Sequence, residues 1–494
     1  MKQLIFFLCL ALIGCRSRNS PPATSPIQLH PENGRYFLFR GDPTILISSA
    51  EHYGAAINMD FDYVPYLEEL ASKDLNYTRI FAGSYVEDPG AFNIEKNTLA
   101  PKEGRFIAPW SRSSTPGYDN GGNKFDLDQW DQQYFDRLTN FVSKAGENGI
   151  VVEMTFFSSL YGDEGWKSSP LNKNNNINST DSVHRLKVHT MENGNILSYQ
   201  EKMVRKIVNE LNNFDNVIFE IQNEPWADDG VKANLELRSG TKDEDDASLQ
   251  DWQKKVDIAN DASLEWQRKI SSIIVDEESR LPQKHLIAQN IANFRFNISD
   301  PDPNISVFNF HYALPEVVYE NLYLNKVIGF DESGFAGSED DTYRKQAWHF
   351  ILAGGGLFNN LDYSFTTSSP EGQDNQSAPG GGSEEFRKQL MALKDYMYSF
   401  DFISMKPDNA ILEDKNLKAR ALVNPGIEYG VYFQELLNDE LVLNIPKGNY
   451  NIEWIDVRDG NVLESQELKH NGGKITIFTP DFNSDLALKM KNKD

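Results

Sequence analysis

Two glutamates stand at the ends of apolar runs, where a strand would present a carboxyl group to a substrate. The first closes Asn-Val-Ile-Phe-Glu-Ile-Gln-Asn-Glu-Pro-Trp at residues 216–226, and the second lies in Val-Ile-Gly-Phe-Asp-Glu-Ser-Gly at residues 327–334. Proline stops a β-ladder, so Pro225 places Glu224 at the C-terminal end of its strand. Two carboxyl groups about 5–5.5 Å apart can cleave a glycosidic bond with retention, one attacking the anomeric carbon while the other protonates the leaving oxygen. Glu224 and Glu332 are the candidates for this pair.

The roles of the two carboxyl groups require different protonation states. The proton donor must hold its proton near neutral pH, which requires a raised pKa, and a second carboxylate nearby raises it. We therefore expect the charge of Glu332 to raise the pKa of Glu224 in the empty site.

Asp331 is a rival to Glu332 because the two carboxyl groups are adjacent in the sequence. Neighbouring residues of a regular strand point to opposite faces, so we expect only one of them to face the barrel axis. We assign the nucleophile to Glu332 and keep Asp331 as the alternative.

The elements that must position these residues alternate between short β-rich runs and longer amphipathic stretches. This alternation predicts an α/β fold, a (β/α)8 TIM barrel, with active-site residues at the C-terminal ends of its strands. A doubly wound open sheet is the alternative, but no glycine-rich phosphate loop follows the first run. The eight predicted strands are Thr44–Ser49, Tyr77–Ala82, Ile150–Phe156, Val217–Gln222, His285–Gln289, Val307–His311, Val327–Asp331 and Gly356–Asp362.

The stretches between the predicted strands have helical character. Leu138, Phe141, Val142 and Ala145 recur at helical spacing, which gives their segment one apolar face. The predicted helices are Phe61–Lys73, Gln132–Asn148, Ser198–Asn212, Ala247–Asp276 and Thr342–Ala353.

Long stretches follow the second and third predicted strands, at about residues 83–131 and 157–197, and fall on the active-site face of a barrel. Sugar rings commonly stack on aromatic side chains of such loops, although a long loop also needs aromatic anchors of its own. Both interpretations stay open for Trp110, Tyr118, Trp130, Tyr161 and Trp166.

The strand ends together resemble the cellulase-like (glycosyl hydrolase family 5-like) superfamily of retaining TIM-barrel glycoside hydrolases, whose fourth strand also ends in Asn-Glu-Pro. The resemblance implies that Glu224 is the acid/base, that Glu332 is the nucleophile and that Asn223 holds the sugar's 2-hydroxyl. It also implies an arginine near the nucleophile, matched by Arg79.

Further residues at strand ends are expected to line the sugar pocket. His311 and Tyr312 end the sixth predicted strand, where members of the superfamily often have these residue types. Glu51-His52-Tyr53 follows the first, and Trp226 completes the Asn-Glu-Pro segment. The Asp-Glu-Ser-Gly sequence around Glu332 departs from the Glu followed by Phe or Tyr and Gly that is more usual, which is why Asp331 stays in question.

The pattern changes near residue 404 from helices to strands separated by turns such as Asn424-Pro-Gly and Asp459-Gly. We therefore predict a barrel domain over residues 28–403 and a small all-β sandwich of about seven strands over 404–494. Residues 441–459 resemble the sandwich, named a collagen-binding domain, that follows many barrels of this kind.

The N-terminus resembles a bacterial lipoprotein signal. Lys2 precedes an apolar stretch that is too short to span a membrane, and Leu12-Ile13-Gly14-Cys15 has the order of a lipobox. We predict a signal peptide over residues 1–15, lipidation of Cys15, a tether over 16–27 and a place in the cell envelope, held to the membrane by the lipid alone. An ordinary cleaved signal peptide is the alternative.

Composition excludes other functions. A formal net charge of -25 disfavours a nucleic-acid partner. Cys9 lies in the signal, so a mature chain beginning at Cys15 has neither a disulfide framework nor a thiolate metal site. We expect no metal, because the acidic run Asp243-Glu-Asp-Asp lacks the glycine of a calcium loop, and no cofactor.

The predicted function is hydrolysis of a plant or microbial polysaccharide or its oligosaccharides. The alternatives are a transglycosylase that uses the same carboxylates and a glycan-binding protein that has lost turnover.

Overall fold

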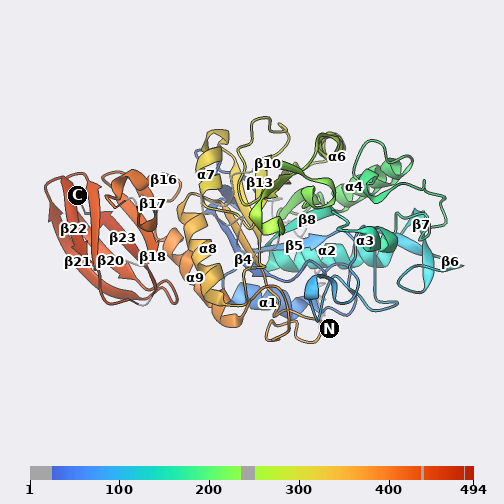
Figure 1. The fold of residues 1–494 in the computed structure, drawn as a ribbon, viewed down its shortest axis with the longest axis horizontal. Coiled ribbons are helices and arrows are strands. Elements are labelled where there is room, and N and C mark those ends of the chain that lie inside the picture. The colour runs from blue at the N-terminus through green and yellow to red at the C-terminus, as the bar shows by residue number, and fades with distance from the viewer. Residues whose placement is uncertain (1–24, 235–250, 415, 435–438, 483, 494) are drawn as a thin grey trace, which may run out of the picture.

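The computed structural model describes residues 25–234, 251–414, 416–434, 439–482 and 484–493. A barrel of strands and helices forms the larger part, and a stack of antiparallel strands adjoins it beyond α8 (Asp340–Leu352) and α9 (Glu384–Tyr398) (Figure 1). Cys15, the signal peptide, most of the tether and the acidic run at 243–246 lie outside the described residues. None of the helices in the described ranges has the length and apolar character that crossing a membrane requires.

The barrel consists of eight parallel strands in the order β4-β15-β14-β13-β12-β9-β8-β5. Its seam, between β4 and β5, is bridged by the side-chain amide of Asn76, which donates to the carbonyl of Ile45 and accepts from the N–H of Ile47, both at 2.9 Å. All eight predicted strands are present, so the TIM barrel is confirmed and the open sheet was wrong. The strands are β4 (Leu46–Ala50), β5 (Tyr77–Phe81), β8 (Val151–Ser158), β9 (Val217–Asn223), β12 (Leu286–Asn293), β13 (Val307–His311), β14 (Val327–Ser333) and β15 (Leu357–Leu361).

The helices cover the barrel with apolar faces, and α2 shows how one begins at a polar cap. On α2 the predicted face of Leu138, Phe141, Val142 and Ala145 is buried, and the Asp131 side chain accepts from the first N–H groups. Apart from α8 and α9, the helices are α1 (Tyr63–Ser72), α2 (Gln132–Glu147), α3 (Asp163–Ser168), α4 (Ile196–Leu211), α5 (Trp226–Asp229), α6 (Asp261–Glu278) and α7 (Glu316–Asn321).

The helix predicted over Ala247–Asp276 is wrong at its start. Residues 247–250 lie outside the described ranges, and β11 (Val256–Ile258) pairs with β10 (Val231–Asn234). The helix α6 begins only after Asn260, whose side chain accepts from the N–H of Ser263. A strand pair and a helix cap therefore override the helical pattern read across this segment.

The opposite end of the barrel is closed by the N-terminal segment. The short strands β1 (Gln28–Leu29), β2 (Phe37–Phe39) and β3 (Asp42–Thr44) form a small sheet, and Ile27, Phe37 and Phe39 pack against the first residues of the barrel strands. This segment plugs the N-terminal end of the barrel interior. A hairpin of β6 (Trp110–Pro116) and β7 (Asn123–Trp130) extends from the loop after β5.

The C-terminal region consists of separate antiparallel sheets with a core of their own. It contacts the barrel through α8, where Trp348 stacks on Tyr432 at 5.4 Å between ring centroids and Arg344 donates to Asp485 at 2.8 Å. The strands are β16 (Lys406–Pro407), β17 (Lys418–Asn424), β18 (Glu428–Gln434), β19 (Glu440–Ile445), β20 (Gly448–Ile455), β21 (Val462–His470), β22 (Gly473–Phe478) and β23 (Asp485–Asn492).

Candidate active site

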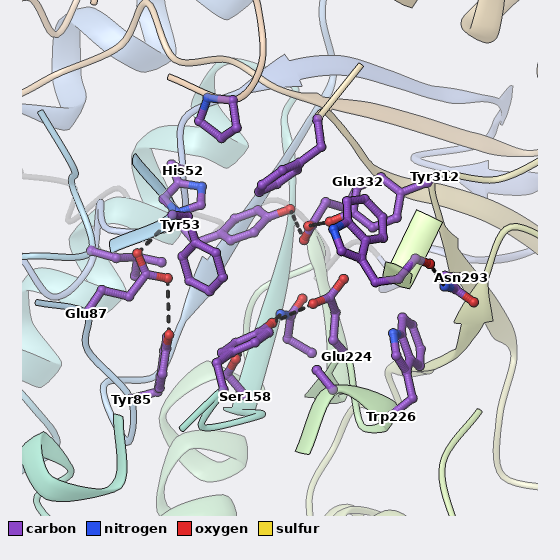
Figure 2. A pocket seen from close by; sticks show the side chains of 18 of the residues that line it. His52, Tyr53, Tyr85, Glu87, Ser158, Glu224, Trp226, Asn293, Tyr312 and Glu332 are labelled. Carbon is purple, nitrogen blue, oxygen red and sulfur yellow. Dashed lines mark hydrogen bonds and ion pairs between the residues drawn. The ribbon is translucent and has the colours of Figure 1, made fainter. Parts of the chain in front are cut away.

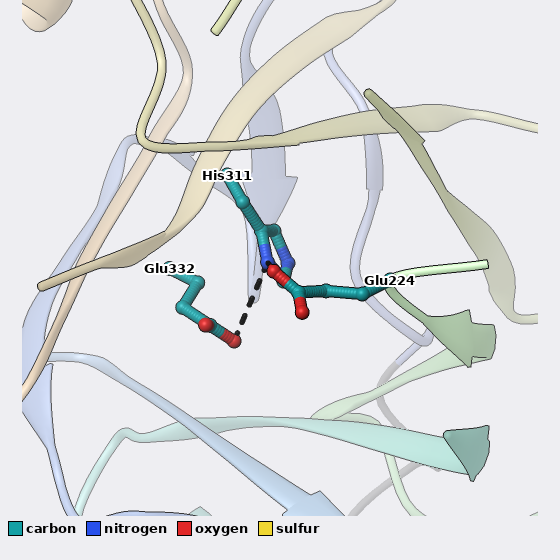
Figure 3. A group of neighbouring side chains, drawn as sticks. All are labelled: Glu224, His311 and Glu332. Atoms are coloured by element: carbon teal, nitrogen blue, oxygen red, sulfur yellow. Dashed lines mark hydrogen bonds and ion pairs between the residues drawn. The ribbon is translucent and has the colours of Figure 1, made fainter. Parts of the chain in front are cut away.

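A cavity of about 560 Å³ lies at the C-terminal strand ends, and Glu224 and Glu332 both line it (Figure 2). With His311 they form a group that we name the upper cluster (Figure 3). One carboxylate oxygen from each glutamate and a ring nitrogen of His311 all lie within 4.8 Å of one another. The two predicted catalytic glutamates therefore face each other across one pocket.

Glu224 is fixed through its backbone and its carboxylate. It follows β9 with a φ of 45°, a left-handed conformation that few residues other than glycine adopt. Its N–H donates to Asn290 Oδ1 at 2.9 Å, and its carboxylate accepts from the Tyr161 hydroxyl at 2.8 Å. The His311 Nδ1 atom lies 2.9 Å from its other oxygen.

Glu332 is held mainly by two tyrosines. Its carboxylate accepts from the hydroxyls of Tyr312 at 2.9 Å and Tyr53 at 3.1 Å, and Arg79 Nη1 lies 3.4 Å away. With only 5% of its surface exposed, Glu332 is oriented by the protein before any substrate arrives.

The expectation that only one of Asp331 and Glu332 faces the barrel interior was wrong. Asn309 of β13 pairs with Gly329 of β14, and His311 pairs with Glu332. One residue separates the two pairs on β13 and two residues separate them on β14, so β14 has a β-bulge. Both carboxyl groups therefore contact Arg79 and His311, each within 3.5 Å. They differ in depth, because Glu332 lines the cavity whereas Asp331 is fully buried beneath it.

The expected order of the pKa values of Glu224 and Glu332 is reversed. Burial raises the pKa of Glu332, and the charge of Glu224 adds to this while His311 opposes it. Burial acts on Glu224 too, but the hydrogen bond and charge of His311 outweigh it and hold the pKa of Glu224 below its ordinary value. Burial lowers the pKa of His311, yet the charges of Glu332 and Asp331 hold it well above its ordinary value. The proton of the upper cluster therefore resides largely on His311.

Beneath the upper cluster lie three fully buried carboxyl groups, Glu153, Glu220 and Asp331, which we name the lower cluster. Arg79 Nε donates to Glu220 at 2.7 Å and lies 3.4 Å from Asp331. Glu153 accepts from Tyr77 and from Asn309, and burial with the charges of Glu220 and Asp331 raises its pKa well above the ordinary range. Both clusters have ligand atoms spaced for a cation, but protein donors already take up carboxylate oxygens in each of them.

The predicted sugar-binding residues separate into two layers. Asn223, Tyr312, His52 and Trp226 line the cavity. The other two, Arg79 and His311, are fully buried and reach the carboxylates from below.

The structure corrects one expectation about the pocket lining and decides between the two interpretations of the loop aromatics. Glu51 does not line the cavity, because its carboxylate accepts from the backbone N–H groups of Gly54 and Ala55 and from Thr98. Of the five loop aromatics, only Tyr161 lines this cavity. Trp110, Tyr118 and Trp166 are buried, and Trp130 packs against the core, so these four are anchors of the long loops.

The sequence reasoning missed several residues around the carboxylates. It did not predict that Tyr53 bonds Glu332, that Asn290 fixes the backbone of Glu224, or that Glu87 lines the cavity. It also passed over Glu220, which lies on β9 four residues before Glu224. The inward alternation of β9 carries a signal for Glu220, whereas nothing in the sequence brings Glu87 to the pocket.

Comparison with known proteins agrees with this geometry. The family model of cellulase (glycosyl hydrolase family 5) matches residues 105–321, which include Glu224 and His311. No curated protein matches the chain by sequence. A solved glycoside hydrolase of family 5 from Bacteroides vulgatus ATCC 8482 is 13% identical, with a TM-score of 0.63 over 95% of this chain and 93% of its own. Another solved glycoside hydrolase is also 13% identical, with a TM-score of 0.61 over 95% of this chain and 97% of its own. At these identities the two structures show a shared fold.

Proposed function

We propose that this chain, whose barrel belongs to the cellulase-like superfamily of glycoside hydrolases, hydrolyses glycosidic bonds with retention of configuration at the anomeric carbon. The observation that carries the proposal is the distance between the two pocket carboxylates. One oxygen of Glu224 lies within 4.8 Å of one oxygen of Glu332. Retaining enzymes hold their carboxyl groups about 5–5.5 Å apart, whereas inverting enzymes need about 6.5–9.5 Å to admit a water molecule.

In this proposal Glu332 is the nucleophile. A bond forms between its carboxylate oxygen and the anomeric carbon, the glycosidic C–O bond breaks, and the leaving oxygen takes the electron pair and a proton from Glu224. Water then attacks the anomeric carbon and gives its proton to Glu224, and Glu332 departs as a carboxylate. The hydrogen bonds from Tyr53 and Tyr312 support this role because they hold the Glu332 carboxylate in a fixed orientation.

The hydrogen bond between His311 and Glu224 supports a mechanism in which the two side chains share the catalytic proton, an arrangement that we name the proton store. The pair holds one labile proton, which passes through Glu224 to the leaving oxygen and leaves a neutral imidazole beside a carboxylate. When Glu332 bonds to the sugar, the negative charge that held the proton on His311 disappears. The proton released by the attacking water then returns the pair to its starting state.

We propose a plant or microbial polysaccharide, or an oligosaccharide from one, as the substrate, and no cofactor. Asn223 lines the cavity, and in the described structure its Oδ1 atom has no protein hydrogen-bond partner, which suits an acceptor for the sugar's 2-hydroxyl. Trp226 offers an apolar surface beside Glu224 on which a second sugar ring can stack.

The anchoring of the chain is a separate proposal. Lipidation of Cys15 would hold the enzyme at the bacterial envelope, with residues 16–27 as the tether. Metabolic labelling with palmitate in a bacterial host tests this: label in the mature protein that disappears in Cys15→Ala supports it, and an unlabelled mature protein rejects it.

The first experiment on function measures products from β-mannan, β-glucan, xylan and pectic glycans with the wild type, Glu224→Gln and Glu332→Gln. We expect at least one glycan to be cut, both variants to lose most activity while staying folded, and NMR of the first product to show the substrate's anomeric configuration. Binding without cleavage by the wild type contradicts the proposal. Products longer than the substrate when an acceptor sugar is added indicate a transglycosylase.

A further inference from the structure

We propose that the pocket receives one end of a glycan and that the enzyme removes sugars from the non-reducing end, because the side of the pocket next to Glu332 is closed. The inference rests on the proposed function and deepens it by assigning the mode of attack. It is carried by an arch of aromatic residues over the carboxylates, by two loops tied together behind that arch, and by a polar pair at the closed end.

Four aromatic side chains from four different loops form the arch, which we define as Tyr161, Phe92, Phe335 and Tyr312. Phe92 meets Tyr161 edge to face at 5.1 Å between ring centroids, and it contacts Phe335 at 6.4 Å. Phe335 in turn packs against Tyr312 at 5.9 Å. The two ends of the arch are bonded to the two carboxylates, Tyr161 to Glu224 and Tyr312 to Glu332.

The backbone of the arch is unusual in the same way at every position. Phe92, Tyr161, Tyr312 and Phe335 have φ values of 54°, 57°, 52° and 54°, in the left-handed region that bulky side chains rarely adopt. Such conformations persist only where surrounding structure imposes them, and they concentrate at functional sites. The chain therefore aims all four rings over the pocket against their local preference.

The loops behind the arch are tied to each other. The N–H of Glu95 donates to the carbonyl of Ser377 at 3.0 Å, and Lys96 Nζ lies 2.7 Å from the carboxylate of Asp374. These bonds join the loop after β5 to the loop after β15 across the loop that follows β4. The pocket wall on this side consists mainly of buried residues, namely His52, Tyr53, Phe81, Tyr85, Glu87 and Leu99. The two tied loops add Asn93, which is exposed, and Pro379, which is half-buried.

The opposite side of the pocket has a different character. Its described lining residues include Ala227 and Gly230, which are exposed, and Trp252, Lys255 and Asp257, which are partly exposed. In Figure 2 the two glutamates lie between the group of His52, Tyr85 and Glu87 and the group of Trp226 and Asn293. The scissile bond thus has a closed side and a solvent-exposed side.

The roles of the two glutamates decide which part of the substrate lies on which side. Tyr53 belongs to the closed wall and bonds the nucleophile, so the sugar whose anomeric carbon is attacked occupies that side. Trp226 and Ala227 follow Glu224 by two and three residues, so the leaving group that Glu224 protonates lies toward the exposed side. A sugar in the closed side with its anomeric carbon at the scissile bond is the non-reducing end of its chain.

His52 and Glu87 are the groups at the closed end that can recognise this terminal sugar. His52 Nδ1 has no hydrogen-bond partner in the described structure, and Nε2 lies 3.6 Å from the Glu87 carboxylate, which is longer than a hydrogen bond. Glu87 is fixed by donors from Tyr85 and Asn97. A ring nitrogen beside a carboxylate can form hydrogen bonds with two neighbouring hydroxyls of a neutral terminal sugar. A pocket that forms a hydrogen bond with a substrate hydroxyl discriminates strongly against analogues that lack this hydroxyl.

The test uses manno-, cello- and xylohexaose carrying a fluorescent label at the reducing end. We expect the wild type to shorten a labelled chain stepwise from its unlabelled end, and to release no dye from cross-linked dyed mannan, glucan or xylan, which report internal cuts. If the wild type releases dye, or if mid-chain labelled fragments appear first, the inference fails while the proposed function stands. If no probe is cut and the native glycan panel is also untouched, the proposed function fails.

Two variants sharpen the test on whichever hexasaccharide is cut. Phe92→Ala removes the centre of the arch, and we expect the ratio of internal to terminal cleavage to rise at least tenfold. Phe478→Ala is the matched control, because that phenylalanine is 64% exposed in the C-terminal region, and it should leave the ratio unchanged. Glu87→Gln should raise KM for the hexasaccharide at least tenfold with a smaller change in kcat. An unchanged ratio in Phe92→Ala, with KM unchanged in a folded Glu87→Gln, overturns the proposal.

Discussion

The barrel holds two groups of acidic side chains one layer apart, and only the upper one has the properties of a reaction centre. Glu224 and Glu332 of the upper cluster are 8% and 5% exposed and line the cavity, whereas Glu153, Glu220 and Asp331 of the lower cluster are fully buried. The upper carboxylates keep a face toward the pocket. The carboxylates of the lower cluster accept hydrogen bonds from protein donors, namely Arg79, Tyr77, Thr155 and two asparagines. The two clusters contain the same kinds of acidic side chain, and they differ in whether a ligand in the cavity can reach the carboxylates.

The largest effect on activity should come from Glu332→Gln. We expect kcat/KM to fall by at least ~10³-fold with little change in thermal unfolding, because the substitution removes the proposed nucleophile and keeps the shape of the side chain. Asp331→Asn should retain clearly more activity, since Asp331 does not line the cavity. Steady-state kinetics on a cleaved glycan decides between them. If Asp331→Asn were the more damaging of the two in a folded protein, the roles of the upper and lower clusters would be reversed.

Arg79→Met should show the largest effect on stability. It leaves the buried Glu220 without its cation and Asp331 with His311 alone, and removing one partner of a buried ion pair costs about 3–5 kcal/mol. Urea unfolding of the variant measures this loss. The double variant Arg79→Met, Glu220→Gln should recover part of it, and equal stability of the single variant and the wild type would show that the lower cluster is not held by charge.

His311→Asn tests the proton store of the upper cluster. We expect kcat to fall by roughly 10²-fold, at the low end for loss of a general acid–base partner. Since the pKa of His311 is raised, the wild type keeps the proton to higher pH than a free histidine and loses activity only as pH rises through that raised value. The alkaline limb of the kcat/KM profile, which reports pKa values of the free enzyme, should therefore move to lower pH in the variant. An unmoved limb would place the proton on Glu224 alone.

The smallest effect should come from Tyr77→Phe in the lower cluster. Glu153 would lose the hydrogen bond from the Tyr77 hydroxyl, at a cost of about 1 kcal/mol of unfolding free energy. The kinetic constants should stay unchanged, because neither residue lines the cavity. A kinetic change without a stability change would connect the two clusters functionally.

Local patterning predicted much of this molecule. Strand β13 was predicted with its observed bounds, and Asn223-Glu224-Pro225 placed a carboxyl group at a strand end because proline cannot continue a ladder. The start of α6 was missed because the pairing of β10 with β11 depends on residues brought together by the barrel, which a periodic pattern does not record.

The sequence by itself determined the barrel, the antiparallel C-terminal region and the two glutamates of the pocket, because alternation, helical spacing and strand-ending residues are local properties. Tertiary structure alone decided that a bulge in β14 turns both Asp331 and Glu332 inward, and that His311 lowers the pKa of Glu224. It also decided that Phe92 reaches Phe335 over the carboxylates. Each of these depends on a distance between segments far apart in the chain, and such distances are set only when the strands close into a barrel.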